Sequence, residues 1–295
     1  MFQGSERMDS FDTACQILPS PLRRRIEAFG PRCPEEIRLR LLRPPALVIN
    51  GREMELAGDR LSENELNQVL ERATGASLHA AMPGMLGGYI SCKGLRIGLC
   101  GSGIMNQGQL VGFRDFSSLA IRLPRECRGI CDSFIDRLTQ PGLENTLIVS
   151  PPGLGKTTLL RELIRVLSDR GTRVAVLDER NELSASTGGK QHFDLGRCSD
   201  VLVGVPKGTG VGMLLRGMNP QVIAMDEISA GEDKQVIERI IGCGVSILAS
   251  AHGRDRHDML RRPMYRELFE MGAFSNVLTI SRDGKNRRYS LERLE

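Results

Sequence analysis

The sequence contains no tryptophan and only 3 tyrosines and 9 phenylalanines among its 295 residues. Proteins that hold single-stranded nucleic acid stack the bases on aromatic side chains, so this scarcity argues against that class. The formal net charge is only +4, from 40 basic and 36 acidic residues, which gives no general electrostatic footprint for nucleic acid. The composition therefore carries no strong nucleic-acid signal.

Long apolar runs are also missing. No stretch approaches the roughly 18 to 20 consecutive apolar residues that a membrane-spanning helix needs. The first residues also lack the basic, apolar and small-residue layout of a signal peptide. We expect no membrane span in this chain and a cytoplasmic location. Residues 1–8 are expected to lie outside the fold, as residues added by cloning or a disordered start, and Met8 is a candidate native start.

The first part of the chain has short elements of both kinds. Apolar residues recur at helical spacing over residues 9–30, and the strand-like runs 36–41 and 46–49 precede the Asn50-Gly51 turn signal. Ser62 and Glu65 form a capping box, which predicts a helix over residues 63–74. Four strand-like segments follow, at 89–90, 95–99, 109–112 and 119–123. We predict an N-terminal α+β domain over residues 9–125, then a connecting helix or linker over 126–142.

After residue 143 apolar strands alternate with helices. The predicted strands are 146–149, 173–177, 221–225 and 245–249, and the predicted helices are 157–169 and 232–241. Short, fully apolar strands joined by helical crossovers indicate a mostly parallel sheet with helices on both faces. We therefore predict an α/β nucleotide-binding domain over residues 143–295.

A strand, a glycine-containing loop and a helix follow one another at residues 147–160, the context that a Walker A phosphate-binding motif requires. Ser150 stands where the motif usually begins with glycine, but glycines remain where the backbone must approach the phosphates. Lys156 is expected to neutralise the β- and γ-phosphates, and the Thr157 hydroxyl to hold Mg²⁺. The predicted nucleotide-binding residues are Pro152, Gly153, Leu154, Gly155, Lys156, Thr157 and Thr158.

Acidic residues end two of the predicted strands. The strand at 221–225 is followed by Asp226 and Glu227, a Walker B arrangement with Asp226 on the metal and Glu227 on the attacking water. Glu179 follows a second strand and is the alternative catalytic carboxylate. His252 ends a third strand at the same edge and could sense the γ-phosphate through a hydrogen bond.

Taken together, these strand ends resemble those of the secretion ATPases that power type II and type IV systems and pilus retraction. Residues 214–228 are similar to a helix of that family with a catalytic arginine, here Arg216, and to its Walker B strand. Residues 178–183 and 251–252 are similar to its acidic and histidine boxes. Asp226 is a departure, because many members have glycine there.

The resemblance implies a RecA-like P-loop ATPase that binds ATP and Mg²⁺ and assembles into a ring, expected to be a hexamer. In such rings ATP lies between two domains, and basic residues of a neighbouring subunit complete the site. Arg96, Arg114 and Arg122 are the candidates for that contribution in trans.

Longer strings, at 94–101, 113–122, 155–162 and 177–183, are similar to a branch of this family that acts in endospore formation. This resemblance implies a motor on the mother-cell side of a channel that joins mother cell and forespore. Its expected partners are further copies of the chain and the membrane proteins of that channel.

Three functions stay open at this point. The first is a motor ATPase coupled to a secretion-like channel, the second a nucleotide-dependent assembly scaffold with little turnover, and the third a nucleic-acid translocase. ATP is expected rather than GTP, because the sequence has no Asn-Lys-x-Asp string of the kind that reads guanine. The motor ATPase is the principal hypothesis.

Overall fold

We analysed a computed structural model of the chain, which describes residues 10–29, 34–49, 51–75, 82, 84–124, 126–140, 142–186, 188–229, 231–284 and 286–294. The expected start segment 1–8 lies outside these residues. The chain forms two compact units. One unit comprises Met1–Arg125 with Ala185–His192, and the other comprises Glu126–Ser184 with Phe193–Glu295. The segment Ala185–His192, which the sequence did not single out, is thus grouped with the first unit.

The first unit contains an antiparallel six-stranded sheet in the order β3-β2-β1-β6-β5-β4. Its strands are β1 (Glu36–Arg40), β2 (Ala46–Ile49), β3 (Arg52–Glu55), β4 (Tyr89–Cys92), β5 (Leu95–Asn106) and β6 (Gln109–Arg122), and its helices include α1 (Ser10–Ile17), α2 (Ser20–Ala28) and α3 (Glu63–Thr74). The strand-like runs predicted at 36–41 and 46–49 correspond to β1 and β2, which pair antiparallel. The predicted capping box of α3 is also confirmed, since the Ser62 and Glu65 side chains each accept from the other residue's backbone N–H.

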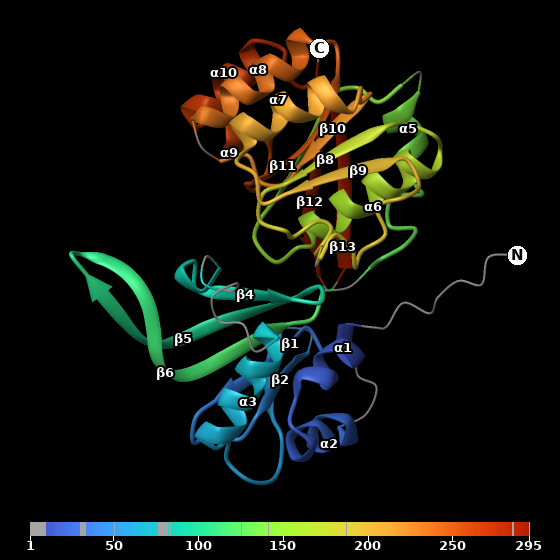
Figure 1. The fold of residues 1–295 in the computed structure, drawn as a ribbon. Helices are drawn as coiled ribbons and strands as arrows, with labels where there is room; N and C mark the ends of the chain where they lie inside the picture. The colour runs from blue at the N-terminus through green and yellow to red at the C-terminus, as the bar shows by residue number, and fades with distance from the viewer. Residues whose placement is uncertain are drawn as a thin grey trace, which may run out of the picture. The chain divides into compact units, whose positions relative to one another are not determined.

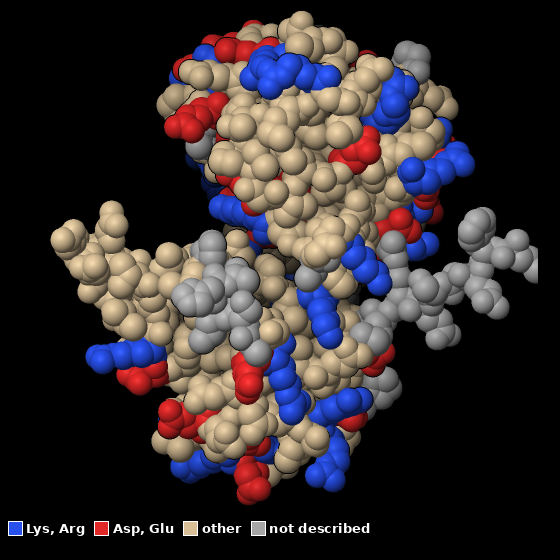
Figure 2. Space-filling model, in the orientation of Figure 1, with Lys and Arg blue, Asp and Glu red and all other residues tan. Residues whose placement is uncertain are grey.

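The prediction of separate strands at 109–112 and 119–123 is wrong, because one strand, β6, runs through both. Its partner β5 also continues to Asn106, so the two strands extend beyond the rest of the sheet as a hairpin (Figure 1). Residues 101–113 of this hairpin include no charged side chain, and Ile104 and Met105 are exposed. Figure 2 shows this uncharged tip. The sequence pattern predicted short separate strands here and did not predict the long hairpin.

The second unit contains a seven-stranded sheet in the order β13-β12-β7-β11-β10-β8-β9. The strands are β7 (Thr146–Ser150), β8 (Val174–Asp178), β9 (Ser199–Val203), β10 (Val222–Met225), β11 (Ser246–His252), β12 (Asn276–Asp283) and β13 (Asn286–Arg293). All neighbouring pairs are parallel except the pair of β12 with β13. The predicted mostly parallel sheet is therefore confirmed.

Helices cover both faces of this sheet (Figure 1). They are α5 (Ile135–Thr139), α6 (Lys156–Asp169), α7 (Lys207–Gly217), α8 (Glu232–Gly242), α9 (Arg256–Leu260) and α10 (Pro263–Glu270). Successive strand residues point to opposite faces. Leu147 of β7 belongs to the core under α7, α8 and α10, whereas Ile148 belongs to the core under α5 and α6. Fully apolar strands are required because both faces are buried.

The connecting helix predicted for residues 126–142 is shorter than expected. Only α5 is helical in the part of that segment that the structure describes, and it is preceded by turns. Among the described residues, none of the helices has both the length and the apolar character needed to cross a bilayer.

Candidate nucleotide-binding site

The P-loop connects β7 to α6. Gly153 and Gly155 have φ angles of 77° and 93°, in the left-handed region that residues with a Cβ disfavour. Gly155 is the N-cap of α6, whose first residue is Lys156. The first turn of a helix offers N–H groups without intrahelical partners and a partial positive charge. The loop and helix start therefore have the backbone geometry of an anion site.

Lys156 is a buried cation in this site, with 6% of its surface exposed. Burial lowers the pKa of its ammonium group, and the positive charge of Arg180 lowers it further, while Asp226 and Glu227 oppose that change. The lysine therefore lies close to the two acidic residues that end β10. A phosphate group would supply the negative charge that favours its protonated form.

Asp226 directly follows β10 and lies beside the P-loop. The Thr157 hydroxyl donates to Asp226 Oδ2 at 3.3 Å, and the Ser250 hydroxyl donates to Asp226 Oδ1 at 2.6 Å. Hydroxyl and carboxylate oxygens are ligands that Mg²⁺ accepts, usually one or two of them together with substrate phosphates. The described residues include no cluster of three or more His, Cys, Asp or Glu side chains suited to a metal. Thr157 and Asp226 thus fit a metal ion shared with a bound nucleotide.

Glu227 has a strained backbone. Its φ angle is 40°, a conformation that costs a non-glycine residue about 1 to 3 kcal/mol unless its surroundings impose it. Here the Glu227 N–H donates to Asp226 Oδ1 and to Ser250 Oγ, both at 3.0 Å, and its carbonyl accepts from Lys207 Nζ at 2.8 Å. These three contacts fix the direction in which the Glu227 carboxylate leaves the strand.

The loop after Glu227 is fixed as well. The buried Tyr265 hydroxyl donates to the carbonyl of Ile228, and burial raises the pKa of Tyr265 to about 12. The Ser229 N–H donates to Asp233 Oδ2 at 2.7 Å. The backbone is therefore fixed both at Glu227 and in the residues that follow it.

Three predicted site residues gather at the carboxyl edge of the sheet, because β8, β10 and β11 are parallel neighbours that end at the same level. Arg180 Nη1 donates to Glu227 Oε2 at 2.6 Å, and His252 Nε2 lies 3.8 Å from Glu227 Oε1. Glu179 Oε2 lies 3.8 Å from Lys207 Nζ. Glu227 and His252 thus face each other, whereas Glu179 pairs with a different residue.

A cavity of about 790 Å³ opens beside this edge. Its lining includes Glu179, Arg180, Lys207, Glu227 and Asp233. The volume is within the range of sites that hold small molecules. The cavity lies on the carboxylate side of the site, since its lining contains Asp226 and Glu227 but no P-loop residue.

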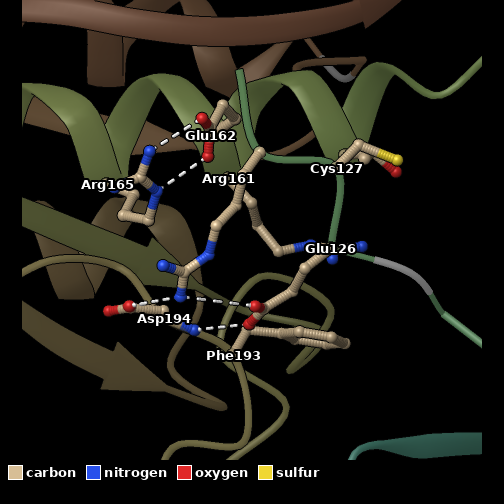
Figure 3. Close-up of a pocket in the computed structure, with 9 residues that line it drawn as sticks. Glu126, Cys127, Arg161, Glu162, Arg165, Phe193 and Asp194 are labelled. Atoms are coloured by element: carbon tan, nitrogen blue, oxygen red, sulfur yellow. Dashed lines mark hydrogen bonds and ion pairs between the residues drawn. The ribbon is translucent and has the colours of Figure 1, made fainter. Parts of the chain in front are cut away.

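Side chains of the P-loop helix α6 contact neighbouring segments of the second unit, and Figure 3 shows Arg161, Glu162 and Arg165 of this helix with Phe193. The buried Arg161 guanidinium lies 4.0 Å from the ring centre of Phe193, and burial lowers the pKa of Arg161 to about 10. Glu162 accepts from the Gly129 N–H at 2.7 Å and pairs with Arg165 at 2.8 Å. Phe193 and Gly129 lie just after the two points at which the chain enters the second unit. The helix is therefore fixed to both of these entry segments.

The structure does not bring Arg216 to the other predicted residues. Arg216 is exposed in the last turn of α7, whereas Lys207, at the first residue of that helix, contacts Glu227. Its catalytic role stays a prediction.

The three arginines proposed to act in trans lie in the first unit. Arg96 of β5 and Arg122 of β6 are directly opposite each other in the register, and Arg122 Nε lies 3.4 Å from Glu36 Oε1. Arg114 is exposed and pairs with its neighbour Asp115 at 3.5 Å. Their contribution to a neighbouring site also stays a prediction.

Sequence reasoning missed several residues of the site. Lys207 and Ser250 belong to no motif. Arg180 lies within the acidic segment 178–183, in which only the carboxylates were predicted to act. The guanidinium of Arg287, in β13, lies 3.2 Å from the position that a Cβ on Gly155 would take. The only signal for Arg287 was a pair of basic residues near the end of the chain.

Comparisons with known proteins agree with this fold. The family model described as "Sporulation stage III, protein AA" matches residues 9–290. The chain is 35% identical over 255 residues to Stage III sporulation protein AA of Bacillus subtilis (strain 168), which covers 84% of this chain and 82% of that protein.

Two solved structures are similar in fold. The Legionella pneumophila ATPase DotB matches with a TM-score of 0.62 and 17% identity, over 100% of this chain and 83% of DotB. The pilus retraction motor PilT with bound ADP matches with a TM-score of 0.61 and 16% identity, over 93% of this chain and 81% of PilT. At these identities the likeness shows the fold alone, which this chain shares with DotB and PilT. By the family match and the identity to the Bacillus subtilis protein, the chain belongs to the sporulation stage III protein AA family.

Proposed function

We propose that this protein is a Mg²⁺-dependent ATPase that works as the motor of a secretion-like channel in sporulation. The observation that carries the proposal is the meeting of three features at one sheet edge. These are the P-loop with its buried Lys156, the contact between Thr157 and Asp226, and the constrained Glu227. Together they supply what phosphoryl transfer to water requires.

In this proposal each residue has a defined task. The P-loop amides and Lys156 bind the β- and γ-phosphates, and Thr157 and Asp226 would hold a metal ion, which would neutralise charge on the phosphate oxygens. Glu227 orients a water molecule toward the γ-phosphorus and accepts its proton. His252, 3.8 Å from Glu227, is placed to hydrogen-bond to the γ-phosphate or the water.

Glu227 is the better candidate for the catalytic base than Glu179. The backbone of Glu227 is fixed by Asp226, Ser250 and Lys207, and its carboxylate faces His252. Glu179 is 41% exposed and pairs with Lys207 at 3.8 Å. We assign Glu179 a supporting role, in which its charge holds Lys207 in position.

The ring is part of the proposal. Further copies of the chain would bring Arg96, Arg114 or Arg122 to the phosphates of a neighbouring subunit, where a cation stabilises the charge of the transition state. Membrane proteins of the sporulation channel are the proposed docking partners, with the ring on the mother-cell side. Family membership and the secretion-ATPase fold support this assignment.

The test is phosphate release and solution mass, measured together with Mg-ATP for the wild type and Lys156→Ala. Hydrolysis by an oligomer, lost in the variant and indifferent to single-stranded DNA, supports the motor. A protein that binds ATP without turnover is a scaffold instead. Stimulation by single-stranded DNA would favour a translocase, and equal hydrolysis by both proteins would remove the proposed site.

Sharing of the site between subunits is tested by mixing two inactive variants, Lys156→Ala and Arg122→Ala. If Arg122 acts in trans, some interfaces of a mixed ring combine an intact P-loop with an intact arginine, so activity returns on mixing. The same experiment applies to Arg96 and Arg114. If replacing one of these arginines by alanine leaves hydrolysis unchanged, that arginine does not act in trans.

A further inference from the structure

Arg180 stands at the tip of a rigid turn after β8. The buried carboxylate of Asp178 accepts N–H groups of Glu182 at 2.7 Å, Leu183 at 3.0 Å and Ser184 at 2.8 Å. A carboxylate that accepts three backbone N–H groups fixes the chain around it. The backbone of Arg180 therefore has a defined place, although nothing in the sequence motif required a cation there.

The side chain of Arg180, in contrast, is more than half exposed. It is 54% exposed, and its ion pair with Glu227, at 2.6 Å, involves a carboxylate that is itself 24% exposed. Ion pairs of this exposure contribute little to folding stability. The pair therefore needs an explanation other than stability.

The ion pair is incompatible with the task proposed for Glu227. The Glu227 oxygen that accepts from Arg180 at 2.6 Å is occupied by that contact, so it cannot at the same time accept a proton from water. Hydrolysis therefore requires the guanidinium to leave Glu227 while remaining nearby. The Arg180 guanidinium can leave Glu227 readily only if a second anion is close enough to replace that carboxylate as its partner.

The γ-phosphate is that anion. The water activated by Glu227 must lie between this carboxylate and the γ-phosphorus, so a guanidinium in contact with Glu227 lies about one water molecule from the phosphoryl oxygens.

We propose that Arg180 is a catalytic arginine supplied by the chain's own subunit, which moves from Glu227 to the γ-phosphoryl oxygens when Mg-ATP binds. This inference rests on the proposed ATPase function. In the reaction, the water oxygen bonds to the γ-phosphorus as the bond from phosphorus to the bridging oxygen breaks. The bridging oxygen leaves with the electron pair on ADP, and the water proton passes to Glu227. Arg180 stabilises the charge on the transferring oxygens.

The test compares Arg180→Ala and Arg180→Lys with a matched control, Arg170→Ala, in the full-length protein. Arg170 pairs with Asp136 at 2.8 Å and is 45% exposed, but it follows the last residue of α6, at the other end of that helix from the P-loop. Two quantities are measured for each protein: the hydrolysis rate at saturating Mg-ATP, and the calorimetric affinity for Mg-ADP with and without fluoroaluminate, which imitates the transferring phosphoryl group.

We expect Arg180→Ala to lower kcat by about 100-fold or more, the effect of removing one transition-state donor. Fluoroaluminate should strengthen Mg-ADP binding to the wild type roughly 100-fold. The Arg180→Ala variant should lose most of this gain, while its affinity for Mg-ADP alone stays within about threefold. Arg180→Lys should be intermediate, because lysine keeps the charge but not the planar fork of donors.

Two results would overturn the inference. An increase of kcat in Arg180→Ala would make Arg180 an inhibitory latch on Glu227, and values equal to those of Arg170→Ala would make the ion pair incidental. Failure of the proposed function looks different. In that case Lys156→Ala would bind Mg-ADP and hydrolyse ATP as well as the wild type, or the wild type would bind no nucleotide at all.

Discussion

The hydroxyl of Ser250 donates to Asp226 Oδ1 at 2.6 Å from the neighbouring parallel strand, and its oxygen accepts the N–H of Glu227 at 3.0 Å. One buried side chain thus orients the proposed metal ligand and the backbone of the proposed base together. A hydrogen bond from a neighbouring side chain commonly sets the orientation of a metal ligand. The relation makes Ser250 a positioning residue rather than a catalytic one.

Replacing Ser250 by alanine should therefore lower kcat more than it changes ATP affinity. We expect a loss of about 10- to 100-fold, the range found when a partner of a metal ligand is removed. The cost in unfolding free energy should be about 1 to 3 kcal/mol, because Asp226 loses a buried donor. Steady-state kinetics and urea unfolding measure the two effects. Ser246→Ala is the control, since Ser246 lies at the other end of β11 and donates to the carbonyl of Leu143; equal losses of kcat in both variants would contradict the assignment.

The choice between the two carboxylates gives a second prediction. Glu227→Gln should bind Mg-ATP with near-normal affinity but hydrolyse it at least about 100-fold more slowly, because glutamine cannot accept the proton. Glu179→Gln should lose less, since the Glu179 side chain pairs with Lys207. Single-turnover hydrolysis with radiolabelled ATP separates binding from chemistry. A greater loss for Glu179→Gln would exchange the two roles.

The part of the site that lies at the ends of parallel strands could be predicted from the sequence. The strand ends at Asp178, Asp226 and His252 meet because apolar strands of a covered sheet end at one edge, a rule that needs no side-chain detail. Outer strands were less predictable. Strands β9, β12 and β13 were not predicted, because their exposed or mixed residues lack the continuous apolar run of the central strands.

The geometry around Glu227 could not be predicted from the sequence. Its left-handed backbone depends on contacts with Ser250 and Lys207, which are 23 and 20 residues away in the chain. Local propensity would place a glycine in such a conformation. Strained positions of this kind are where tertiary contacts override local rules, and they concentrate at functional sites.

Tyr265 gives a pH-dependent prediction. Burial raises the pKa of its hydroxyl from the usual 10.0 to about 12, so the protonated form is favoured in the folded state. The stability that this hydroxyl contributes is present below pH 10 and is lost as the pH rises from about 10 to about 12. Urea unfolding of the wild type should show an extra loss on the order of 2 kcal/mol over this window.

The control for this prediction is Tyr265→Phe, which cannot titrate. At pH 8 the variant should be less stable by about 1 to 3 kcal/mol, because the carbonyl of Ile228 loses its donor. The difference between the two proteins should shrink as the pH rises toward 12. A difference that stays constant would show that the hydroxyl does not titrate in this range.

Lys156 gives a prediction in which stability and binding change in opposite directions. Burial lowers the pKa of its ammonium group, so without a nucleotide the charged form is penalised in the folded protein at neutral pH. Methionine has a similar length and no charge, so Lys156→Met should raise the unfolding free energy by about 1 kcal/mol, or roughly 2 to 4 °C in Tm.

Saturating Mg-ATP should reverse this order of stability between the wild type and Lys156→Met. A ligand at about 100 times its Kd stabilises the wild type by about 2.7 kcal/mol, whereas the variant without a phosphate-binding lysine gains little. Lys234→Met, on the surface of α8, is the control and should keep the nucleotide-dependent shift. If Lys156→Met melts below the wild type without nucleotide, the buried lysine is stabilised by its neighbours rather than held ready for a phosphate.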